Sequence, residues 1–401
     1  MNSAVLLAVC LANLPVEKAF LRELPDIFGR AAANYRALDA AATPRARDAK
    51  GNERIPRTYD AAKREVHMVR STDWTAGHYA GALWYLHEAT KDDFFKDRAQ
   101  FWMQLVATNA TVTSNHDVGF IMYCSYGNAR RLLKTDHFDA ILTETADSLM
   151  KRYDPTLGLI RSWGKIGEKK NFLVIPDNLM NLELLEFAAK ANGEKGRRYH
   201  EAAVSHARQT DLHHYRADSG CYHVLDYDQT TLRVKNIDRG QGASCFTAWS
   251  RGQSWSIYGF TMMYRETREP SFLKRAVACA DFAIGNPNMP ADGVPYWDYG
   301  APGEERDSSA VAIMASALVE LAGFVGGEKG ARYRAFAVRQ LASLSSPAYF
   351  AKPDEIGGFL LKHGVGAKPL GTEIDVPLNY GDYYYLEALL RLSSTSTLHL
   401  K

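Results

Sequence analysis

Two aspartates, Asp117 and Asp177, each stand immediately before an apolar run of helical periodicity. Cleavage of a glycosidic bond or an enol ether needs a proton donor and a way to activate water, and paired carboxyl groups supply both. Capping of a helix N-terminus is an equally good interpretation of either aspartate taken singly. Because Ile175 and Pro176 give Asp177 apolar surroundings, which favour a protonated carboxyl, we predict that Asp177 is the proton donor.

Four tryptophans, Trp74, Trp163, Trp249 and Trp255, fall in loops or near the ends of predicted helices. The flat apolar face of a tryptophan matches the C–H face of a sugar ring. Core packing explains any one of them, but four near one predicted rim favour a carbohydrate site.

Arg251 has a side chain suited to bind a substrate carboxylate at two points, which a lysine does less well. An ion pair with a rim aspartate is an equally good interpretation. A histidine in water titrates near neutral pH, which makes His116 and His223 candidates for the site, and we expect His223 to hydrogen-bond substrate. No HExxH or similar spacing accompanies the histidines, so the sequence predicts neither a metal site nor another cofactor.

Apolar residues recur at helical spacing in paired blocks joined by turns rich in Gly, Pro, Asp and Asn. The first block of each pair is apolar almost all round, which predicts a buried helix, whereas the second is charged on one face, which predicts an exposed one. The predicted buried helices are Ala80–Leu86, Val118–Tyr126, Leu179–Ala188, Trp255–Met263, Ala310–Leu321 and Tyr383–Leu390. The predicted exposed helices are Asp92–Leu105, His137–Met150, Gly196–His213, Ser271–Ile284, Lys329–Leu344 and the N-terminal stretch Val16–Leu38.

Six inner and six outer helices predict a closed all-α toroid, an (α/α)6 barrel, because one helical pair cannot bury its apolar stripe alone. An open helical solenoid is the alternative. We expect one catalytic domain over residues 1–401, with short β-rich insertions at Tyr222–Val234 and Gly357–Ile374. In such a toroid the N-terminal ends of the inner helices, with Asp117 and Asp177, converge on one mouth.

The overall composition excludes several classes of function. The 48 basic and 46 acidic residues are spread along the chain without dense Lys/Arg blocks, so no nucleic-acid partner is expected. Residues 1–13 contain an apolar run too short to span a bilayer, which is either a signal remnant or a helical lead-in. Five widely separated cysteines predict buried thiols. We expect a monomer or homodimer without a membrane partner, in the cytoplasm or the periplasm, with the cytoplasm favoured.

Several motifs, in this order along the chain, resemble those of unsaturated glucuronyl hydrolases, glycoside hydrolase family 88. The resemblance covers nearly the whole chain after about residue 50, and the ordered set is far more specific than any one motif. The motifs are Asp73-Trp-Thr-Ala-Gly77, Asn115-His-Asp-Val-Gly-Phe120, Arg161-Ser-Trp163, Ile175-Pro-Asp-Asn-Leu-Met-Asn-Leu182, Tyr222-His-Val-Leu-Asp-Tyr227, Trp249-Ser-Arg-Gly-Gln-Ser-Trp255, Pro295-Tyr-Trp-Asp298, Asp307-Ser-Ser-Ala310 and Pro377-Leu-Asn-Tyr-Gly-Asp-Tyr383.

The resemblance implies an (α/α)6 barrel that acts, without a metal, on small acidic oligosaccharides left by polysaccharide lyases. It implies that a terminal 4,5-unsaturated uronate, most readily that of a glycosaminoglycan-type disaccharide, is released by hydration of its double bond. Asp177 matches the family's general acid and base, and Asp117 matches a second aspartate that orients substrate. Residues matching substrate-contacting positions are Trp74, Trp163, His223, Gln241, Trp249, Arg251 and Trp255, and we add His116.

The sequence departs from the family pattern at Gly240, where relatives often have histidine, and at Gly364, where they often have serine. Lys362 and Lys368 flank the second departure, and we expect Lys368 or Lys362 to meet a sulfate group on the substrate.

Three alternatives remain open on the sequence. An unsaturated rhamnogalacturonyl hydrolase shares the fold and chemistry but differs in the sugar beside the bond. An epimerase of the acylglucosamine type would rely on paired histidines, and a sugar-binding module would use the tryptophans without catalysis.

Overall fold

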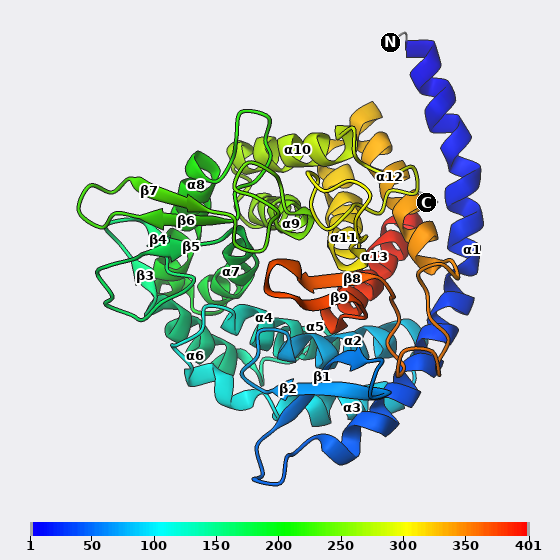
Figure 1. Cartoon of the computed structure of the whole chain (residues 1–401), viewed down its shortest axis with the longest axis horizontal. Coiled ribbons are helices and arrows are strands. Elements are labelled where there is room, and N and C mark those ends of the chain that lie inside the picture. The colour runs from blue at the N-terminus through cyan, green and yellow to red at the C-terminus, as the bar shows by residue number, and fades with distance from the viewer. Residues whose placement is uncertain (1–2, 399–401) are drawn as a thin grey trace.

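The computed structural model describes the backbone of residues 3–398 and the side chains of residues 15–395. In this part of the chain the helices form two concentric rings (Figure 1). The inner ring contains α2 (Ala76–Thr90), α4 (Val118–Met122) continued by a π-helical turn (Tyr123–Gly127) and α5 (Asn128–Leu133), α7 (Leu182–Ala191) preceded by a 3-10 helix (Pro176–Asn181), α9 (Ser250–Thr267), α11 (Ser308–Val325) and α13 (Asn379–Leu398). The outer ring contains α1 (Ser3–Ala42), α3 (Asp93–Gln104), α6 (Asp139–Met150), α8 (Arg197–His213), α10 (Pro270–Gly285) and α12 (Gly327–Ser345).

Both rings close on themselves. In the inner ring α13 packs against α11 on one side and α2 on the other. In the outer ring α1 packs against α12, and its Asp39 binds Arg98 and Trp102 of α3. This confirms the predicted (α/α)6 barrel, including the N-terminal stretch as the sixth outer helix.

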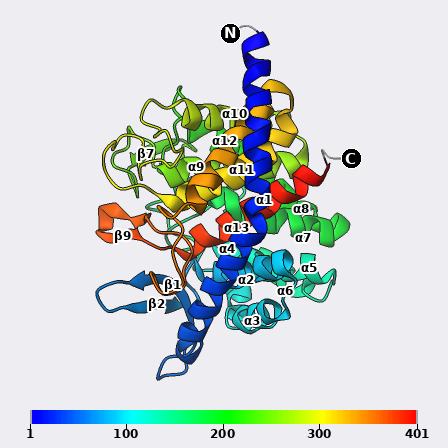
Figure 2. The same cartoon turned by 90° about the vertical axis from the view of Figure 1, so that its right-hand side faces the viewer.

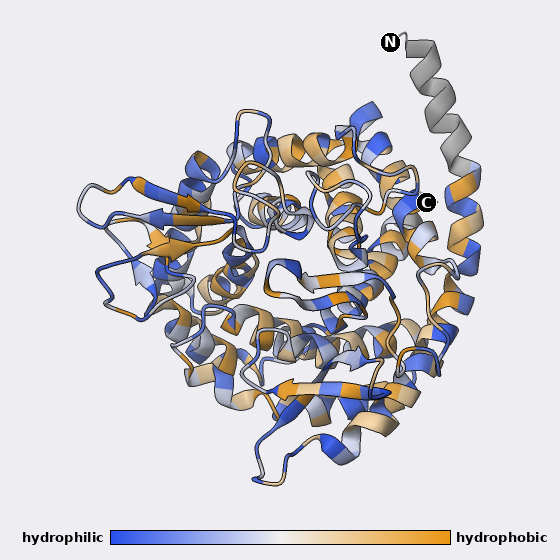
Figure 3. Ribbon diagram, viewed as in Figure 1, coloured by the Kyte–Doolittle hydropathy of each residue, from blue (hydrophilic) through white to orange (hydrophobic). Residues whose placement is uncertain are grey.

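The inner helices are buried and the outer helices are amphipathic, as predicted. In α11 the residues from Ser308 to Val319 are all buried. Its length and composition would suit a membrane span, but 78% of that stretch is buried inside the protein, as in the core helix of a globular fold. By contrast, α1 alternates between hydrophobic and hydrophilic residues along its described length (Figure 3), and its apolar face, with Ile27 and Leu38, is buried.

Short antiparallel strands interrupt the helices. The strands are β1 (Arg54–Asp60) with β2 (Glu65–Arg70), β3 (Tyr153–Asp154) with β4 (Leu159–Ile160), the sheet β5 (Leu173–Val174), β6 (Val224–Tyr227) and β7 (Val234–Asp238), and β8 (Gly364–Ala367) with β9 (Thr372–Val376). The insertions predicted near residues 222–234 and 357–374 are confirmed, whereas the β1–β2 hairpin was not predicted. Figure 2 shows β1, β2, β7 and β9 on one side of the ring, so the insertions build up one face.

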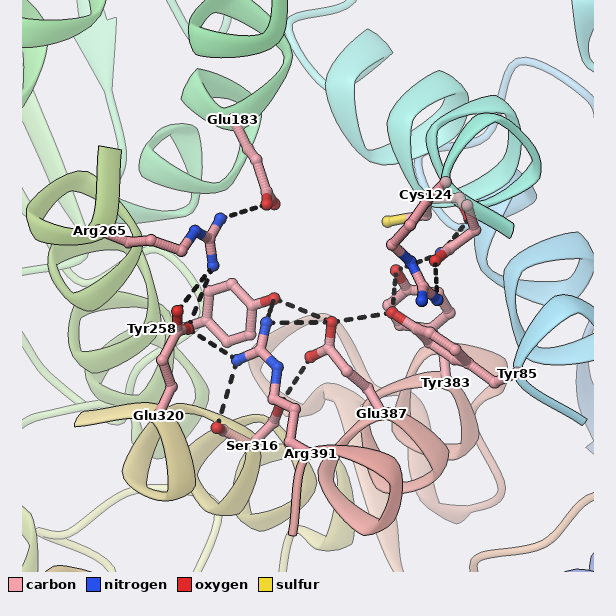
Figure 4. A network of polar contacts seen from close by, with 12 residues as sticks. Tyr85, Cys124, Glu183, Tyr258, Arg265, Ser316, Glu320, Tyr383, Glu387 and Arg391 are labelled. Atoms are coloured by element: carbon pink, nitrogen blue, oxygen red, sulfur yellow. Dashed lines mark hydrogen bonds and ion pairs between the residues drawn. The ribbon is translucent and has the colours of Figure 1, made fainter. Parts of the chain in front are cut away.

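A buried ionic network lies toward the C-terminal ends of the inner helices (Figure 4). Glu387 accepts hydrogen bonds from Tyr258 Oη at 3.0 Å and Ser316 Oγ at 2.6 Å, and Arg391 pairs with both Glu387 and Glu320. Because the negative ends of the inner-helix dipoles gather here, arginines complement the partial charge. The network lines a cavity of about 720 Å³, but its charged groups bind one another, so we assign it a structural role.

Three of the four cysteines whose side chains are described follow the prediction of buried thiols, and Cys245 does not. Cys124, Cys221 and Cys279 are buried free thiols, and Cys245 is a partly exposed one. Cys10 lies outside the described side chains.

Candidate active site

The first turns of the inner helices carry the residues that the sequence singled out. Asp117 directly precedes α4, Asp177 lies in the first turn of the 3-10 helix before α7, Trp249 precedes α9 and Asp307 precedes α11. Hydrogen bonds join these ends, from His116 to Asn178 and from Arg251 to Asp307, as convergence of the helix starts requires.

Asp307 caps its helix, whereas Asp117 and Asp177 do not. Asp307 caps α11 by accepting hydrogen bonds from the N–H groups of Ser309 and Ala310. Asp117 occupies the N-cap position of α4 but accepts no capping bond, and Oδ1 of Asp177 has no partner among the described residues. Capping therefore explains Asp307 and leaves the carboxyl groups of Asp117 and Asp177 without that role.

Asp382, at the start of α13, is also structural. Its carboxylate accepts hydrogen bonds from the N–H groups of Leu360 and Leu361 and from the hydroxyl of Tyr35. These bonds hold the loop before β8, so both oxygens of Asp382 are engaged within the protein.

Burial sets the protonation of the remaining pair. The Asp177 and Asp117 side chains are 15% and 14% exposed. Burial raises the pKa of Asp177 to about 7, the charge of Arg251 opposes this rise, and the charge of Asp117 adds to it. Burial likewise raises the pKa of Asp117 to about 7, against a hydrogen bond from Asn181. The charge of Asp117 acts on Asp177, so the titrations of the two carboxyl groups are coupled near neutral pH.

His116 presents a lone pair beside Asp117. Asn178 donates through Nδ2 to the carbonyl of Ile160 at 2.8 Å, so its Oδ1 must accept the hydrogen bond from His116 Nδ1 at 3.2 Å. His116 is thus protonated on Nδ1, and its bare Nε2 lies 3.2 Å from Oδ2 of Asp117, off the axis of a formed hydrogen bond. Burial lowers the pKa of His116 to about 3, which keeps the ring neutral.

His223 has the opposite tautomer. The backbone N–H of Gln241 donates to His223 Nδ1 at 2.7 Å, so the ring proton lies on Nε2, 3.9 Å from Oδ1 of Asp177. Burial also lowers the pKa of His223 to about 3. The site therefore offers one imidazole acceptor beside Asp117 and one imidazole N–H donor beside Asp177.

Aromatic rings surround His223 and Trp74. The centroid of His223 lies 4.5 Å from that of Trp249 and 5.9 Å from that of Trp163, which is 37% exposed. Trp74 packs against Tyr380 at 4.7 Å. Trp255, however, is fully buried, so the predicted open ring face is corrected: Trp255 forms part of the core beneath the mouth, and its Nε1 is the atom left without a protein partner.

Arg251 is committed to the protein itself. Its Nη atoms donate to the carbonyls of Val365 and Gly366, to Oε1 of Gln241 at 2.7 Å and to Asp307 at 3.3 Å, and the guanidinium stacks over Trp249 at 4.3 Å. The Nη atoms predicted to bind a substrate carboxylate are thus engaged within the protein, and the alternative of an ion pair with a rim aspartate is present. Substrate contact by Arg251 stays a prediction. Its charge still acts on Asp177.

Lys368 is also already paired. Its Nζ contacts both Glu304, at 2.6 Å, and Glu305, and lies over the ring of Trp297. Two carboxylates around one ammonium give this part of the rim a net negative charge, and the sulfate contact at Lys368 stays a prediction. Lys362 pairs with Glu355 at 2.9 Å.

Close packing explains the two departures at glycine. Gly240 has φ +51°, and a Cβ there would lie 2.1 Å from Nδ1 of His223. At Gly364 a Cβ would lie 2.7 Å from the carbonyl oxygen of Val376. A histidine at 240 or a serine at 364 would therefore require the surrounding segments to move.

Asn178 and Asn181 contact His116 and Asp117 but were not predicted as site residues, although both lie in the motif Ile175–Leu182. Their spacing of three residues at a helix start was the available signal. As for metals, no group of three or more His, Cys, Asp or Glu side chains within the described residues is arranged to hold an ion.

Comparison with known proteins gives consistent matches over most of the chain, although no family model matches it. The chain is 42% identical over 348 residues to the unsaturated glucuronyl hydrolase of Formosa agariphila, covering 85% of each chain. It is 34% identical over 334 residues to the unsaturated chondroitin disaccharide hydrolase of Streptococcus pyogenes serotype M1, covering 81% of this chain and 82% of that one.

Solved structures agree with the sequence matches. The crystal structure of an unsaturated glucuronyl hydrolase specific for heparin has a TM-score of 0.86 at 38% identity and covers 94% of this chain and 99% of that chain. A mutant unsaturated glucuronyl hydrolase from Streptococcus agalactiae, complexed with dGlcA-GalNAc6S, has a TM-score of 0.74 at 25% identity and covers 93% and 92% of the two chains.

Proposed function

The chain belongs to the unsaturated glucuronyl hydrolases, glycoside hydrolase family 88, and on that premise we propose that Asp177 and Asp117 carry out its reaction at the mouth described above. The enzyme is a glycoside hydrolase that releases a terminal 4,5-unsaturated uronate. Asp177 is the proton donor, and Asp117 is the second carboxyl group, which orients substrate and raises the pKa of its partner.

The observation that carries this proposal is a set of buried polar atoms without protein partners around one carboxyl pair. Oδ1 of Asp177, Nε2 of His223 and Nε2 of His116 all lack hydrogen-bond partners among the described side chains. Buried polar groups are normally paired, because desolvation without a hydrogen bond costs free energy. A polar ligand with hydroxyl and ether oxygens supplies the missing partners.

The family implies the chemistry, and the donor and acceptor pattern of the site fits it. Asp177 transfers its proton to C4 of the unsaturated uronate, and positive charge develops at C5 and the ring oxygen. Water adds to C5, its released proton returns to the Asp177 carboxylate, and the resulting hemiketal opens with departure of the neighbouring sugar. His223, as an N–H donor, and His116, as an acceptor, orient substrate oxygens on either side of the pair.

We infer that the substrate is a small acidic oligosaccharide of the glycosaminoglycan type. Support comes from the relatives, whose names specify heparin and chondroitin disaccharides, and from the dGlcA-containing ligand of the Streptococcus agalactiae structure. The test is loss of ultraviolet absorbance of the conjugated double bond across lyase products of heparin, chondroitin and rhamnogalacturonan. Loss of absorbance with the rhamnogalacturonan product alone would support the rhamnogalacturonyl hydrolase alternative. Binding of every product without loss of absorbance would support a sugar-binding module.

The pH dependence of kcat/KM is expected to be bell-shaped with its maximum near neutral pH. Activity requires one proton on the carboxyl pair, and burial raises the pKa of both Asp117 and Asp177 to about 7. Below the lower apparent pKa both groups are protonated, and above the upper one both are ionised. A profile that is flat from pH 5 to 9 would contradict this assignment.

Replacing Lys368 by alanine is expected to leave the ratio of turnover on sulfated and unsulfated disaccharides unchanged within about twofold, because Glu304 and Glu305 already neutralise this lysine. The matched variant Glu304→Gln with Glu305→Gln frees the ammonium and should raise that ratio. A marked fall of the ratio in Lys368→Ala would show that the lysine binds sulfate despite its two partners.

A further inference from the structure

The β8–β9 hairpin crosses the centre of the ring on the face that carries the mouth (Figure 1). From one side, Arg251 donates to the carbonyls of Val365 and Gly366 in β8. From the other side, Arg57 in β1 binds Glu373 in β9 at two points, Nε to Oε1 at 2.5 Å and Nη2 to Oε2 at 2.6 Å. The hairpin is thus held between two arginines.

Arg57 binds a second carboxylate at the same time. Its Nη1 donates to both oxygens of Asp73, at 2.9 and 2.7 Å. Asp73 immediately precedes Trp74 and is fixed independently by the N–H and the hydroxyl of Thr75, at 3.0 and 2.7 Å. One guanidinium, 17% exposed, therefore joins β1, the start of α2 with Trp74, and the hairpin. An arginine fork that engages two carboxylates restrains geometry as well as charge.

The hairpin needs such external restraint. His363, Glu373 and Asp375, none of them glycine, have φ values of +64°, +53° and +58°. Residues with a Cβ adopt this left-handed region at a cost, so surrounding contacts must hold them there. His363 and Asp375 bind each other at 2.6 Å, and Glu373 is held by Arg57.

Arg57 also controls charge near the catalytic pair. Groups that act on Asp117 are His116 on its own segment, Asn181 and Asp177 from the 3-10 helix, Arg152 after α6, and Asp73 before α2. The negative charge of Asp73 raises the pKa of Asp117. Arg57 is the cation that balances Asp73, so its removal would leave that charge unopposed.

We propose that Arg57 is a positioning residue for the hydrolysis, which fixes the β8–β9 hairpin against the Trp74 segment and balances the charge of Asp73 beside the catalytic pair. The proposal rests on the proposed function for its kinetic consequences. Its structural consequence, a hairpin held by Arg57, does not depend on which substrate is turned over.

Two substitutions separate geometry from charge. In Arg57→Lys the charge remains but one ammonium replaces the fork, so KM should rise roughly tenfold with little change in kcat or in the pH profile. In Arg57→Met the charge is lost as well, so KM should rise and the pH profile should also move toward higher pH, because the unopposed Asp73 raises the pKa of Asp117 further. Unchanged KM and unchanged pH profile in both variants would overturn the proposal.

Partner substitutions keep the test decisive if Arg57→Met does not fold. Glu373→Gln weakens the hairpin contact and leaves the pair of Arg57 with Asp73, so KM should rise without a shift of the pH profile. Asp73→Asn should move the profile toward lower pH. Arg54→Met is the matched control, because Arg54 lies on the same strand but pairs with Asp48 at 2.8 Å, and it should leave both readouts unchanged.

Amide hydrogen exchange of the substrate-free protein tests the same contact without turnover. Residues 364–376 should exchange faster in Arg57→Met and Glu373→Gln than in the wild type or in Arg54→Met. The wild type could show no activity on any unsaturated disaccharide while residues 364–376 still exchange faster in Arg57→Met and Glu373→Gln. That outcome would contradict the proposed function and leave the role of Arg57 in the fold intact. Equal exchange in all four proteins would overturn the proposal.

Discussion

Replacing Asp177 by asparagine is expected to lower kcat by about 10³-fold, because an amide cannot deliver the proton that starts hydration of the double bond. The substitution keeps the size of the side chain, and the buried position needs no charge to fold, so the circular dichroism spectrum and KM should change little. The measurement is the initial rate of loss of double-bond absorbance on a disaccharide that the wild type consumes.

Two further variants accompany Asp177→Asn: one removes the second carboxyl group of the pair, and the other is a control outside the site. Asp117→Asn should lower kcat by about 10²-fold and remove the acid limb of the pH profile, because no second carboxyl group is left to be protonated. It should also move the alkaline limb toward lower pH, because it removes the charge that raises the pKa of Asp177. Asp92→Asn is the control: Asp92 caps the outer helix α3 through the N–H of Phe94, and asparagine caps equally well. If Asp177→Asn keeps a tenth or more of the wild-type kcat, the proton donor is another group.

Replacing Arg391 by methionine is expected to lower the free energy of unfolding by about 3–5 kcal/mol, because it leaves buried carboxylates without their shared cation. Arg391 pairs with Glu320 at 3.0 Å and with Glu387 at 3.3 Å, and it donates to the hydroxyl of Tyr258 at 2.7 Å. Chemical denaturation followed by tryptophan fluorescence measures the change. Since the network lies toward the C-terminal ends of the inner helices, the folded variant should keep the wild-type kcat.

A surface pair provides the comparison for this stability measurement. Arg197 and Glu201 lie one turn apart on α8 and are 80% and 58% exposed. Arg197→Met should change the free energy of unfolding by no more than about 0.5 kcal/mol. If Arg391→Met and Arg197→Met cost the same, the network of Figure 4 contributes no special stability.

The ring architecture was predictable because it follows from the helical spacing of apolar residues within short segments of the sequence. A helix such as α11, apolar on every side, has no stable place except between other helices, and the amphipathic stretch at Val16–Leu38 fits the remaining gap. Asp117 and Asp177 were found for the same local reason, since each precedes an apolar run.

Contacts between distant segments were not predictable in this way. Arg57 and Glu373 are 316 residues apart, and the carbonyls that occupy Arg251 lie more than a hundred residues downstream of it. Nothing in local spacing distinguishes an arginine that will bind substrate from one that will bind a hairpin. Nor does local spacing tell Asp307, which caps its helix, from Asp117, which does not.

The closure of the outer ring by α1 has a consequence for how the protein is made. The ribosome releases α1 long before α12, against which α1 packs and which begins at residue 327. Throughout most of synthesis the apolar face of α1, with Ile27, Ala31 and Leu38, has no neighbour to cover it on that side. Such long-range pairing slows folding and exposes the nascent chain to aggregation, so productive yield in a cell should depend on chaperones that shield this first segment until translation ends.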